Sequence, residues 1–220
     1  KHFGISYEWT QNMISIRRQE YAPRDLNVEA DWTAASYYYQ MAALADEVDL
    51  RIMGLNRMSL QGDAVIAEIM QRFGVKTSFI EGGIHLTKSD GGFGAFEYDF
   101  TDCPDLAQTV VATCAATGVA AKIKGVEHLQ IKETDRMAAM QAEINKIGLS
   151  LIPLGNTWNL GVQAQPYKQP IHFNTYNDHR MAMAFAPLAI KYGEVIIDDP
   201  QVVQKSYPKF WDDIQSLGFS

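Results

Sequence analysis

The chain has 220 residues, 47% of them hydrophobic and 20% charged, which is the composition of a folded globular protein rather than a disordered one. Its formal net charge of −7 argues against a nucleic-acid partner held by a general basic surface, although a cleft with a few convergent cations remains compatible with a small anion. Because no apolar run reaches about 18 residues, and because Cys103 and Cys114 show neither metal-ligand spacing nor a secretory context, the chain is predicted to be cytoplasmic and to lack a membrane span.

One structural unit repeats along the chain with a period of 73 to 74 residues. Asp31, Asp105 and Asp178 each open a segment rich in small residues, at intervals of 74 and 73 residues. Such self-similarity is typical of a fold assembled from copies of one supersecondary unit. The chain is expected to begin on the tail of one unit and to stop after the second helix of another. Glycines keep the same period where a helix is expected to run into a strand, at Gly4, Gly74, Gly148 and Gly218.

The first predicted elements belong to two units. Residues 12–18 resemble the hairpin strand that closes an earlier unit. The next unit follows the order strand, helix, strand, helix and hairpin. Its elements are predicted at residues 26–30, 32–45, 48–54 and 62–73, with a hairpin at 76–81 and 83–88.

The middle unit gives the clearest pattern. Residues 96–101 alternate aromatic and acidic side chains as a strand does, and a helix follows from Pro104, which suits a first helical turn, to about Thr117. A second helix is expected to start with Thr134 as its N-cap and to reach Ile147. With a strand at 120–126 and a hairpin at 149–154 and 157–161, the unit reads βαβαββ. The last unit repeats the order without a hairpin, at 171–174, 178–192, 194–199 and 206–217.

Cationic residues occupy equivalent places at the predicted helix starts. Lys132 and Lys205, 73 residues apart, each stand before the second helix of a unit, while Arg136 and Arg180 lie in first turns. Helix N-termini carry unpaired N–H groups and a partial positive charge. Several of them aimed at one cleft, with these four cations, predict a site for phosphate and carboxylate groups.

Two carboxylates, Asp105 and Glu133, share this basic setting, where one can stay ionised as a base while the other carries a proton. Simpler interpretations remain open. Asp105 and Asp178 could be helix caps alone, residues 132–136 a solvated charge cluster, and His179 an ordinary surface or core histidine. The recurrence of charges at matching repeat positions favours the functional interpretation, because independent surface charges would not repeat.

The motifs resemble those of the 5-enolpyruvylshikimate-3-phosphate synthase family. The similarity runs the whole length, and the motifs are specific as an ordered set rather than singly. They are VEAD at 28–31, ASY at 35–37, PD at 104–105, IKETDR at 131–136, YNDHRMAM at 176–183 and KSYP at 205–208.

The resemblance implies an α/β fold of repeated βαβαββ units with an inside-out arrangement, in which parallel helices point their N-termini at a cleft between two domains. Residues 1–76 would end the first domain, and 77–220 would form most of the second. The implied reaction transfers the enolpyruvyl group of phosphoenolpyruvate to the 5-hydroxyl of shikimate 3-phosphate, releasing phosphate, without a metal or organic cofactor. The resemblance also implies that the full-length enzyme is a monomer.

Individual roles follow from the same resemblance. Asp105 would be the base near the 5-hydroxyl, and Glu133 the acid and base that serves the methylene carbon of phosphoenolpyruvate. The other implied contacts are Tyr37 and Lys132 with shikimate 3-phosphate, His128 beside the substrate ring, Arg136 and Arg180 with the carboxylate of phosphoenolpyruvate, Lys205 with its phosphate, and His179 nearby.

Two positions depart from the family pattern: Ala34 stands where a serine often touches the substrate phosphate, and His128 where an asparagine or acidic residue is usual. The family's N-terminal lysine, its phosphoenolpyruvate-binding glycine and arginine, and its Ser-Ser-Gln motif have no counterpart in the 220 residues. Two alternatives remain, namely enolpyruvyl transfer to a UDP-amino sugar on the same fold and a non-catalytic anion-binding module. Half of a cleft is expected to be inactive alone.

Overall fold

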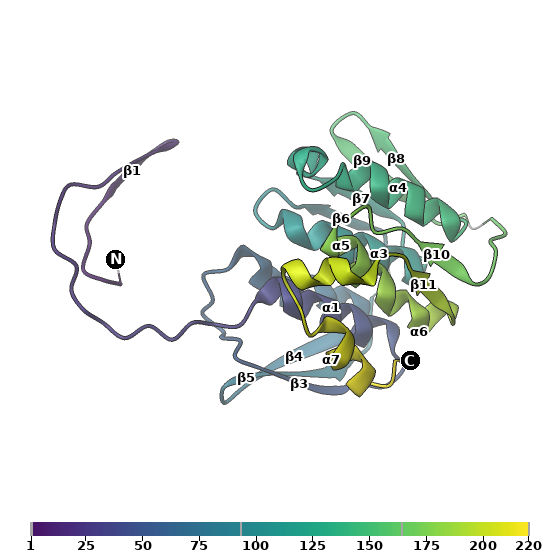
Figure 1. Cartoon of the computed structure of the whole chain (residues 1–220), viewed down its shortest axis with the longest axis horizontal. Helices are drawn as coiled ribbons and strands as arrows, with labels where there is room; N and C mark the ends of the chain where they lie inside the picture. The colour runs from purple at the N-terminus through teal and green to yellow at the C-terminus, as the bar shows by residue number, and fades with distance from the viewer. Residues whose placement is uncertain (1, 93, 164, 220) are drawn as a thin grey trace.

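The computed structural model describes residues 2–92, 94–163 and 165–219, which form a detached N-terminal hairpin and a packed body (Figure 1). The hairpin pairs β1 (Glu8–Thr10) with β2 (Met13–Ser15) in antiparallel register. All six residues are exposed, and an extended segment joins the hairpin to the body. The strand expected at 12–18 therefore exists, but only as a short partner of β1.

The first unit of the body carries a three-stranded antiparallel sheet in the order β3-β5-β4. Its second helix is a short α-helix with a 3-10 turn on either side, at Gly62–Val65 and Met70–Phe73. The remaining elements are α1 (Trp32–Leu44), β3 (Asp49–Met53), α2 (Ile66–Ile69), β4 (Val75–Ile80) and β5 (Gly83–Lys88). The domain boundary suggested between residues 76 and 77 falls inside β4.

The middle unit has the predicted βαβαββ order. Strands β6 and β7 are parallel, the other pairs are antiparallel, and the sheet order is β6-β7-β9-β8. The elements are β6 (Phe96–Asp99), a 3-10 turn (Pro104–Leu106), α3 (Ala107–Thr117), β7 (Ala121–Lys124), a 3-10 turn (Glu127–Ile131), α4 (Arg136–Lys146), β8 (Ser150–Leu154) and β9 (Thr157–Gly161).

The third unit begins like the second, with two parallel strands joined through helices. Strand β10 (Ile171–Phe173) pairs with β11 (Val195–Ile197). The helical elements are α5 (His179–Phe185), a 3-10 turn (Ala186–Leu188), α6 (Ala189–Tyr192), a 3-10 turn (Pro200–Lys205) and α7 (Phe210–Ser216).

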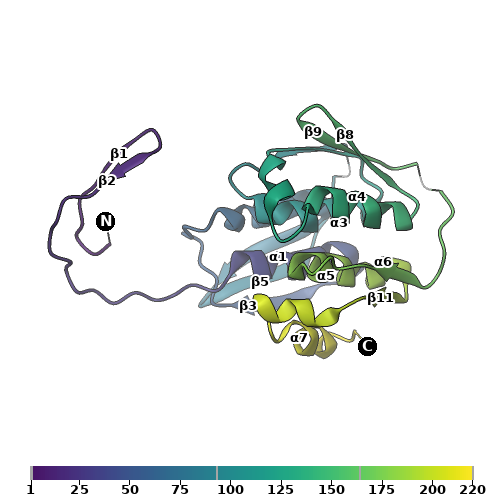
Figure 2. The same ribbon diagram turned by 45° about the horizontal axis from the view of Figure 1, so that its top comes forward.

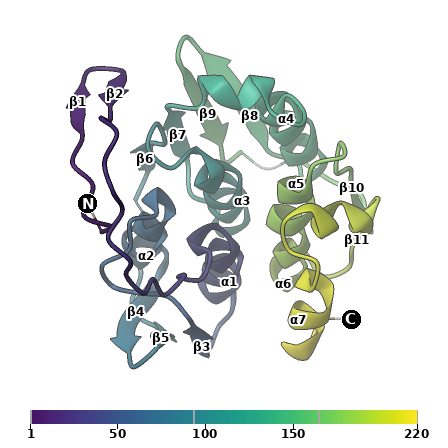
Figure 3. The same cartoon turned by 60° about the vertical axis from the view of Figure 1, so that its left-hand side comes forward.

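Helices α1, α3 and α5 lie side by side in the middle of the body, and the sheets lie outside them (Figures 2 and 3). Ten of the eleven residues of α3 are buried. Repeat-equivalent positions touch: Ser36 Oγ lies 3.3 Å from Thr109 Oγ1, and the Gln108 amide donates to Met181 Sδ at 3.2 Å, each across 73 residues. The predicted stacking of units about parallel inner helices is therefore confirmed.

Gly74, Gly148 and Gly218 follow the ends of helical elements as expected, whereas Gly4 follows a turn and no helix is described before it. All four have a backbone φ between 74° and 99°, a range that residues other than glycine rarely adopt. Gly148 is also sterically required, because a Cβ there would lie 2.0 Å from the carbonyl oxygen of Gln165. The helix-to-strand junctions are thus fixed by backbone conformation.

Two local predictions are wrong. Residues 26–30 form no strand: one backbone hydrogen bond, from Ala30 N–H to Gly54 O at 2.9 Å, joins them to the residue that follows β3, which is too little for a ladder. The N-cap of α4 is Asp135, which accepts from Ala138 N–H at 3.0 Å, and not Thr134. Threonine and aspartate are both good N-caps, so the sequence alone does not show which of the two adjacent residues caps the helix. Over the described ranges, no helix has the length and apolarity needed to cross a bilayer.

Candidate active site

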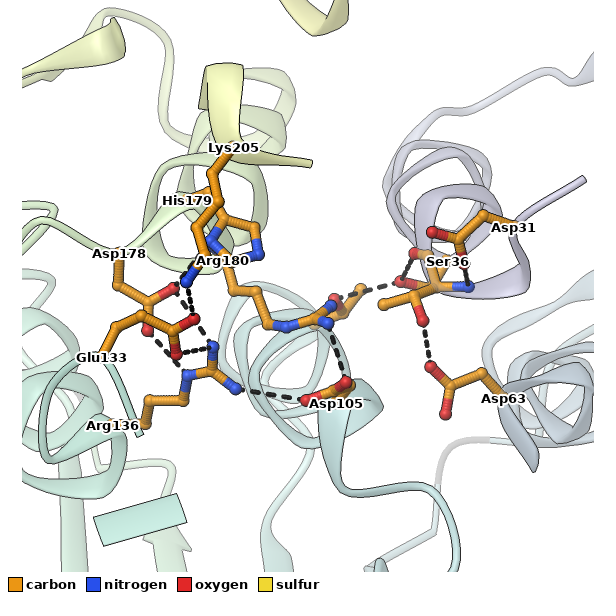
Figure 4. A network of polar contacts seen from close by, with 12 residues as sticks. Asp31, Ser36, Asp63, Asp105, Glu133, Arg136, Asp178, His179, Arg180 and Lys205 are labelled. Atoms are coloured by element: carbon orange, nitrogen blue, oxygen red, sulfur yellow. Dashed lines mark hydrogen bonds and ion pairs between the residues drawn. The ribbon is translucent and has the colours of Figure 1, made fainter. Parts of the chain in front are cut away.

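Charged side chains from the starts of α4 and α5 and from the turns before α3 and α7 converge on one place (Figure 4). Three cations meet three carboxylates there, and each cation contacts at least one carboxylate. The members of this charged cluster are Asp105, Glu133, Arg136, Asp178, Arg180 and Lys205. Five of the nine site residues predicted from sequence are among them; Asp178 is the addition.

Arg136 is the centre of the cluster and is only 2% exposed. Its Nε donates to Asp178 Oδ2 at 2.7 Å, its Nη2 to Glu133 Oε2 at 2.8 Å, and its Nη1 to Asp105 Oδ1 at 3.2 Å. A planar guanidinium offers donors in fixed directions, so these bonds fix the positions of all three carboxylates. Arg136 is the first residue of α4, and the helix start thereby places it in the site.

Asp31, Asp105 and Asp178 occupy equivalent positions in the repeats, but they do not all have the same structural role. Asp31 and Asp178 are N-caps, accepting from the N–H groups of Thr33 and Arg180. Asp105 is not a cap, because Pro104 starts a 3-10 turn one residue earlier and Asp105 lies within that turn. Its two oxygens accept from Arg136 and, at 2.7 Å, from Arg180 Nη2. Of the three, Asp105 is the one whose carboxylate is turned wholly toward cations.

Arg180 crosses the middle of the cluster toward Asp105 (Figure 4) and approaches Tyr37 of α1. Tyr37 is 1% exposed, and burial raises the pKa of its phenol to about 12, with the Arg180 charge acting in the opposite direction. Within the described chain, the Tyr37 hydroxyl and Arg180 Nε are both buried without a hydrogen-bond partner. Both residues line a small space of about 20 Å³, with Ala34 beside them.

Glu133 forms an ion pair with Lys205, across 72 residues of sequence. The hydrogen bond from Lys205, assisted by the Arg136 charge, lowers the pKa of Glu133 to about 2 although partial burial opposes the shift. Glu133 is therefore ionised at neutral pH while Lys205 is its partner. A ligand anion that draws Lys205 away removes the main cause of the shift, and the pKa of Glu133 then rises toward its ordinary value.

Three predicted site residues lie beside the cluster rather than in it. His179 is buried, with Nδ1 3.6 Å from Asp178 Oδ1, and burial followed by the charges of Arg180 and Arg136 lowers its pKa, so it is neutral at pH 7. Lys132 is exposed, and the structure gives it no ion pair with any described residue. His128 is half-buried on the turn before α4 and likewise has no polar contact within the described ranges.

Asp178 is the functional residue that the sequence analysis did not place in the site. It is fully buried, and it both binds Arg136 and caps the helix that carries Arg180. The signal was present, because Asp178 recurs with Asp31 and Asp105 at the repeat period. That signal alone does not distinguish a cap from an arginine partner, and Asp178 is both.

Comparison with solved structures defines the class of fold. The EPSP synthase from Acinetobacter baumannii superimposes with a TM-score of 0.75 over 98% of this chain and 52% of that chain, at 17% identity. The enolpyruvyl transferase NikO from Streptomyces tendae gives a TM-score of 0.67 over 99% and 50%, at 16% identity. The chain therefore has the α/β fold of enolpyruvyl transferases, as predicted.

Sequence comparison then gives the family. The model of the family EPSP synthase (3-phosphoshikimate 1-carboxyvinyltransferase) matches residues 1–214. A 3-phosphoshikimate 1-carboxyvinyltransferase from Bacteroides fragilis is 45% identical over the whole chain and 54% of that protein. The chain belongs to the EPSP synthase family, and it spans about half the length of the curated relatives it matches.

Proposed function

We propose that this chain is part of an enzyme that transfers the enolpyruvyl group of phosphoenolpyruvate to the 5-hydroxyl of shikimate 3-phosphate and releases phosphate. Family membership supports the reaction. The charged cluster supports the chemistry, because both substrates are anions and the reaction moves protons at two places. The proposal assigns the enzyme to the shikimate pathway of aromatic amino-acid biosynthesis, as membership of the EPSP synthase family implies.

The observation that carries the proposal is the orientation of Asp105. A protein that only bound anions would gain nothing from a carboxylate facing two arginines, since it competes with the ligand. Asp105 caps no helix, and its carboxylate accepts hydrogen bonds from Arg136 and Arg180. Such a group suits a base that takes the proton of the attacking hydroxyl while the arginines hold the second substrate.

The proposed steps use the two sides of the cluster. Glu133 protonates the methylene carbon, the hydroxyl oxygen attacks the resulting cationic centre, and Asp105 accepts the hydroxyl proton. A proton then leaves the new methyl group and the carbon–oxygen bond to phosphate breaks, which restores the double bond. Arg136 and Arg180 hold the carboxylate, and Lys205 the phosphate, so that the charge of the leaving group is stabilised where it develops.

Glu133 and Lys205 are coupled in this scheme. With Lys205 as its partner, Glu133 has a pKa of about 2, so the carboxyl is ionised at neutral pH. When the phosphate of phosphoenolpyruvate engages Lys205, the pKa of Glu133 rises toward its ordinary value, which makes this carboxylate easier to protonate.

Tyr37, Lys132, His128 and His179 remain proposed contacts of shikimate 3-phosphate or neighbours of the site. Lys132 is exposed beside Glu133 and able to meet a phosphate without breaking an existing bond. Burial of the Tyr37 hydroxyl next to Arg180 favours an effect through that arginine.

We also propose that the division between domains lies near residue 30 rather than at 76. Helix α1 packs on α3, and buried residues from Trp32 to Leu188 form one core cluster, whereas the β1–β2 hairpin stands apart. Limited proteolysis should cut between residues 16 and 30 and leave a stable remainder. A first cut between residues 45 and 100 would reject this division.

The decisive experiment assays phosphate release by the complete protein with phosphoenolpyruvate and either shikimate 3-phosphate or a UDP-amino sugar. Turnover with shikimate 3-phosphate alone is expected. Turnover with the sugar nucleotide alone would establish the competing transferase activity, and binding of phosphoenolpyruvate without turnover on either acceptor would favour an anion-binding module. The 220-residue chain alone should show no measurable turnover, because closure around both anions needs the rest of the cleft.

A further inference from the structure

The loop that precedes Asp178 in the sequence has a strained backbone. Tyr176 and Asn177 are consecutive non-glycine residues with φ of 55° and 58°. Asparagine tolerates this left-handed region, but an aromatic residue such as Tyr176 rarely adopts it and needs contacts that hold it there. The next residue is Asp178, which binds Arg136 and caps α5. Any relaxation of the loop would therefore move the cluster.

A single buried carboxylate holds this loop from the side. Glu143, in α4, has no exposed surface. Its Oε1 accepts from the Tyr176 hydroxyl at 2.6 Å, and its Oε2 accepts from the Asn174 backbone N–H at 3.0 Å. Oε2 also pairs with Lys146 Nζ at 2.7 Å, which balances the charge of the carboxylate. Both oxygens are thus engaged, as a buried carboxylate requires.

Helix α4 contacts the loop at two points. Arg136 at its start binds Asp178, and Glu143, seven residues later, binds Asn174 and Tyr176. Seven residues are about two turns, so the two side chains project from one face of the helix, roughly 10 Å apart along it. One rigid helix therefore fixes both ends of the segment 174–178.

We infer that Glu143 is a positioning residue, which clamps the loop at 174–177 so that Asp178 and Arg180 keep their places in the charged cluster. Glu143 touches none of the reacting groups assigned above and acts through the loop. The inference rests on the proposed function only for its consequence, which is tighter binding of phosphoenolpyruvate by Arg180. The clamp itself consists of contacts within this chain.

Two variants test the clamp from opposite sides. Glu143→Gln keeps the shape but puts an NH₂ group where an acceptor is needed. Tyr176→Phe removes only the hydroxyl of a ring that is 37% exposed, so it folds even if the Gln variant does not. The matched controls are Glu97→Gln, an exposed carboxylate on β6, and Tyr167→Phe, an exposed ring away from the cluster.

Hydrogen exchange of individual amides separates positioning from general stability. The amides of Asn174 and Arg180 should lose protection about threefold to tenfold in both variants, the range expected for one hydrogen bond, while amides in α3 stay unchanged. Both controls should leave all of these rates unchanged. Equal loss of protection throughout the chain, or no change at 174 and 180, overturns the inference.

Calorimetric titration with phosphoenolpyruvate measures the consequence. Both variants should bind it about threefold to tenfold more weakly than the unmodified chain. If the unmodified chain fails to bind phosphoenolpyruvate, the proposed function is weakened, while the exchange pattern still decides whether the clamp exists. If it binds and the variants bind equally well, the role of Glu143 in positioning Arg180 is rejected.

Discussion

Replacing Asp178 should separate its two tasks, which are capping α5 and neutralising Arg136. Asp178→Asn keeps a side-chain oxygen for the Arg180 N–H, since asparagine is as good a cap as aspartate. The Asn variant loses the negative charge. In the parent chain Arg136 Nε donates to a carboxylate oxygen of Asp178 at 2.7 Å, and in the variant it meets an amide group or a neutral oxygen. Asp178→Ala removes both functions.

The expected magnitudes follow from burial. Breaking a buried ion pair by removing one partner costs about 3–5 kcal/mol. Arg136 is 2% exposed but retains Asp105 and Glu133, so the Asn variant should lose about 1.5–3 kcal/mol, the range of a hydrogen bond to a charged group. The Ala variant should lose about 1 kcal/mol more for the cap. Against a total of about 5–15 kcal/mol, both losses are large.

Urea unfolding of the 220-residue chain measures these differences through the midpoint at unchanged slope. Asp31→Asn is the matched control, because Asp31 caps α1 in the same manner but is exposed and pairs with no described arginine. That control should stay within about 0.5 kcal/mol of the parent chain. If Asp178→Asn is equally silent, the buried pair with Arg136 contributes nothing and the account of the cluster is wrong.

Three further predictions concern the chemistry. In the complete enzyme, Asp105→Asn and Glu133→Gln should each slow turnover by about 10²–10⁴-fold with little change in substrate binding, as single-turnover rates and equilibrium titrations would show; near-normal rates would reject the assigned roles. Arg180→Lys should raise the KM for phosphoenolpyruvate despite the retained charge, because lysine cannot hold a carboxylate through two parallel bonds; an unchanged KM excludes that contact. Lys205→Met should raise the pKa of Glu133 from about 2 toward its ordinary 4.5, which an NMR titration of the carboxyl group would measure. The pKa of Glu133 is lower in the folded chain than in the unfolded one. The Glu133–Lys205 pair therefore stabilises the folded chain above about pH 4.5, and this stabilisation is lost as the pH falls toward 2. A pKa that stays near 2 in the variant would mean that Lys205 is not the cause.

The sequence predicted what depends on local pattern and period. The helices at 32–44 and 107–117, the hairpins and the glycine helix ends agree with the structure within a few residues. Residues 26–30 had the composition of a strand, but strand formation depends on a partner along the whole ladder, which local sequence does not report.

The site was predicted in part for a similar reason. Motif resemblance pointed to Asp105 and Glu133, but the pairing of Arg136 with Asp178, 42 residues away, depends on how two units pack. The same holds for Glu143, whose position inside α4 looks like an ordinary helical glutamate until the loop at 174–177 is seen against it.

The inner helices have a consequence for how this protein tolerates change. Ala112 in α3 and Ala184 in α5 are fully buried in two inner helices that pack against each other, and such small side chains allow close packing of the helix axes. A methylene added there would push neighbouring helices apart and shift the helix starts that carry Asp105 and Arg180, whereas changes on the outer sheets would not. The tolerance of the charged cluster to substitution is therefore governed by small side chains such as these, at positions that bear no charge.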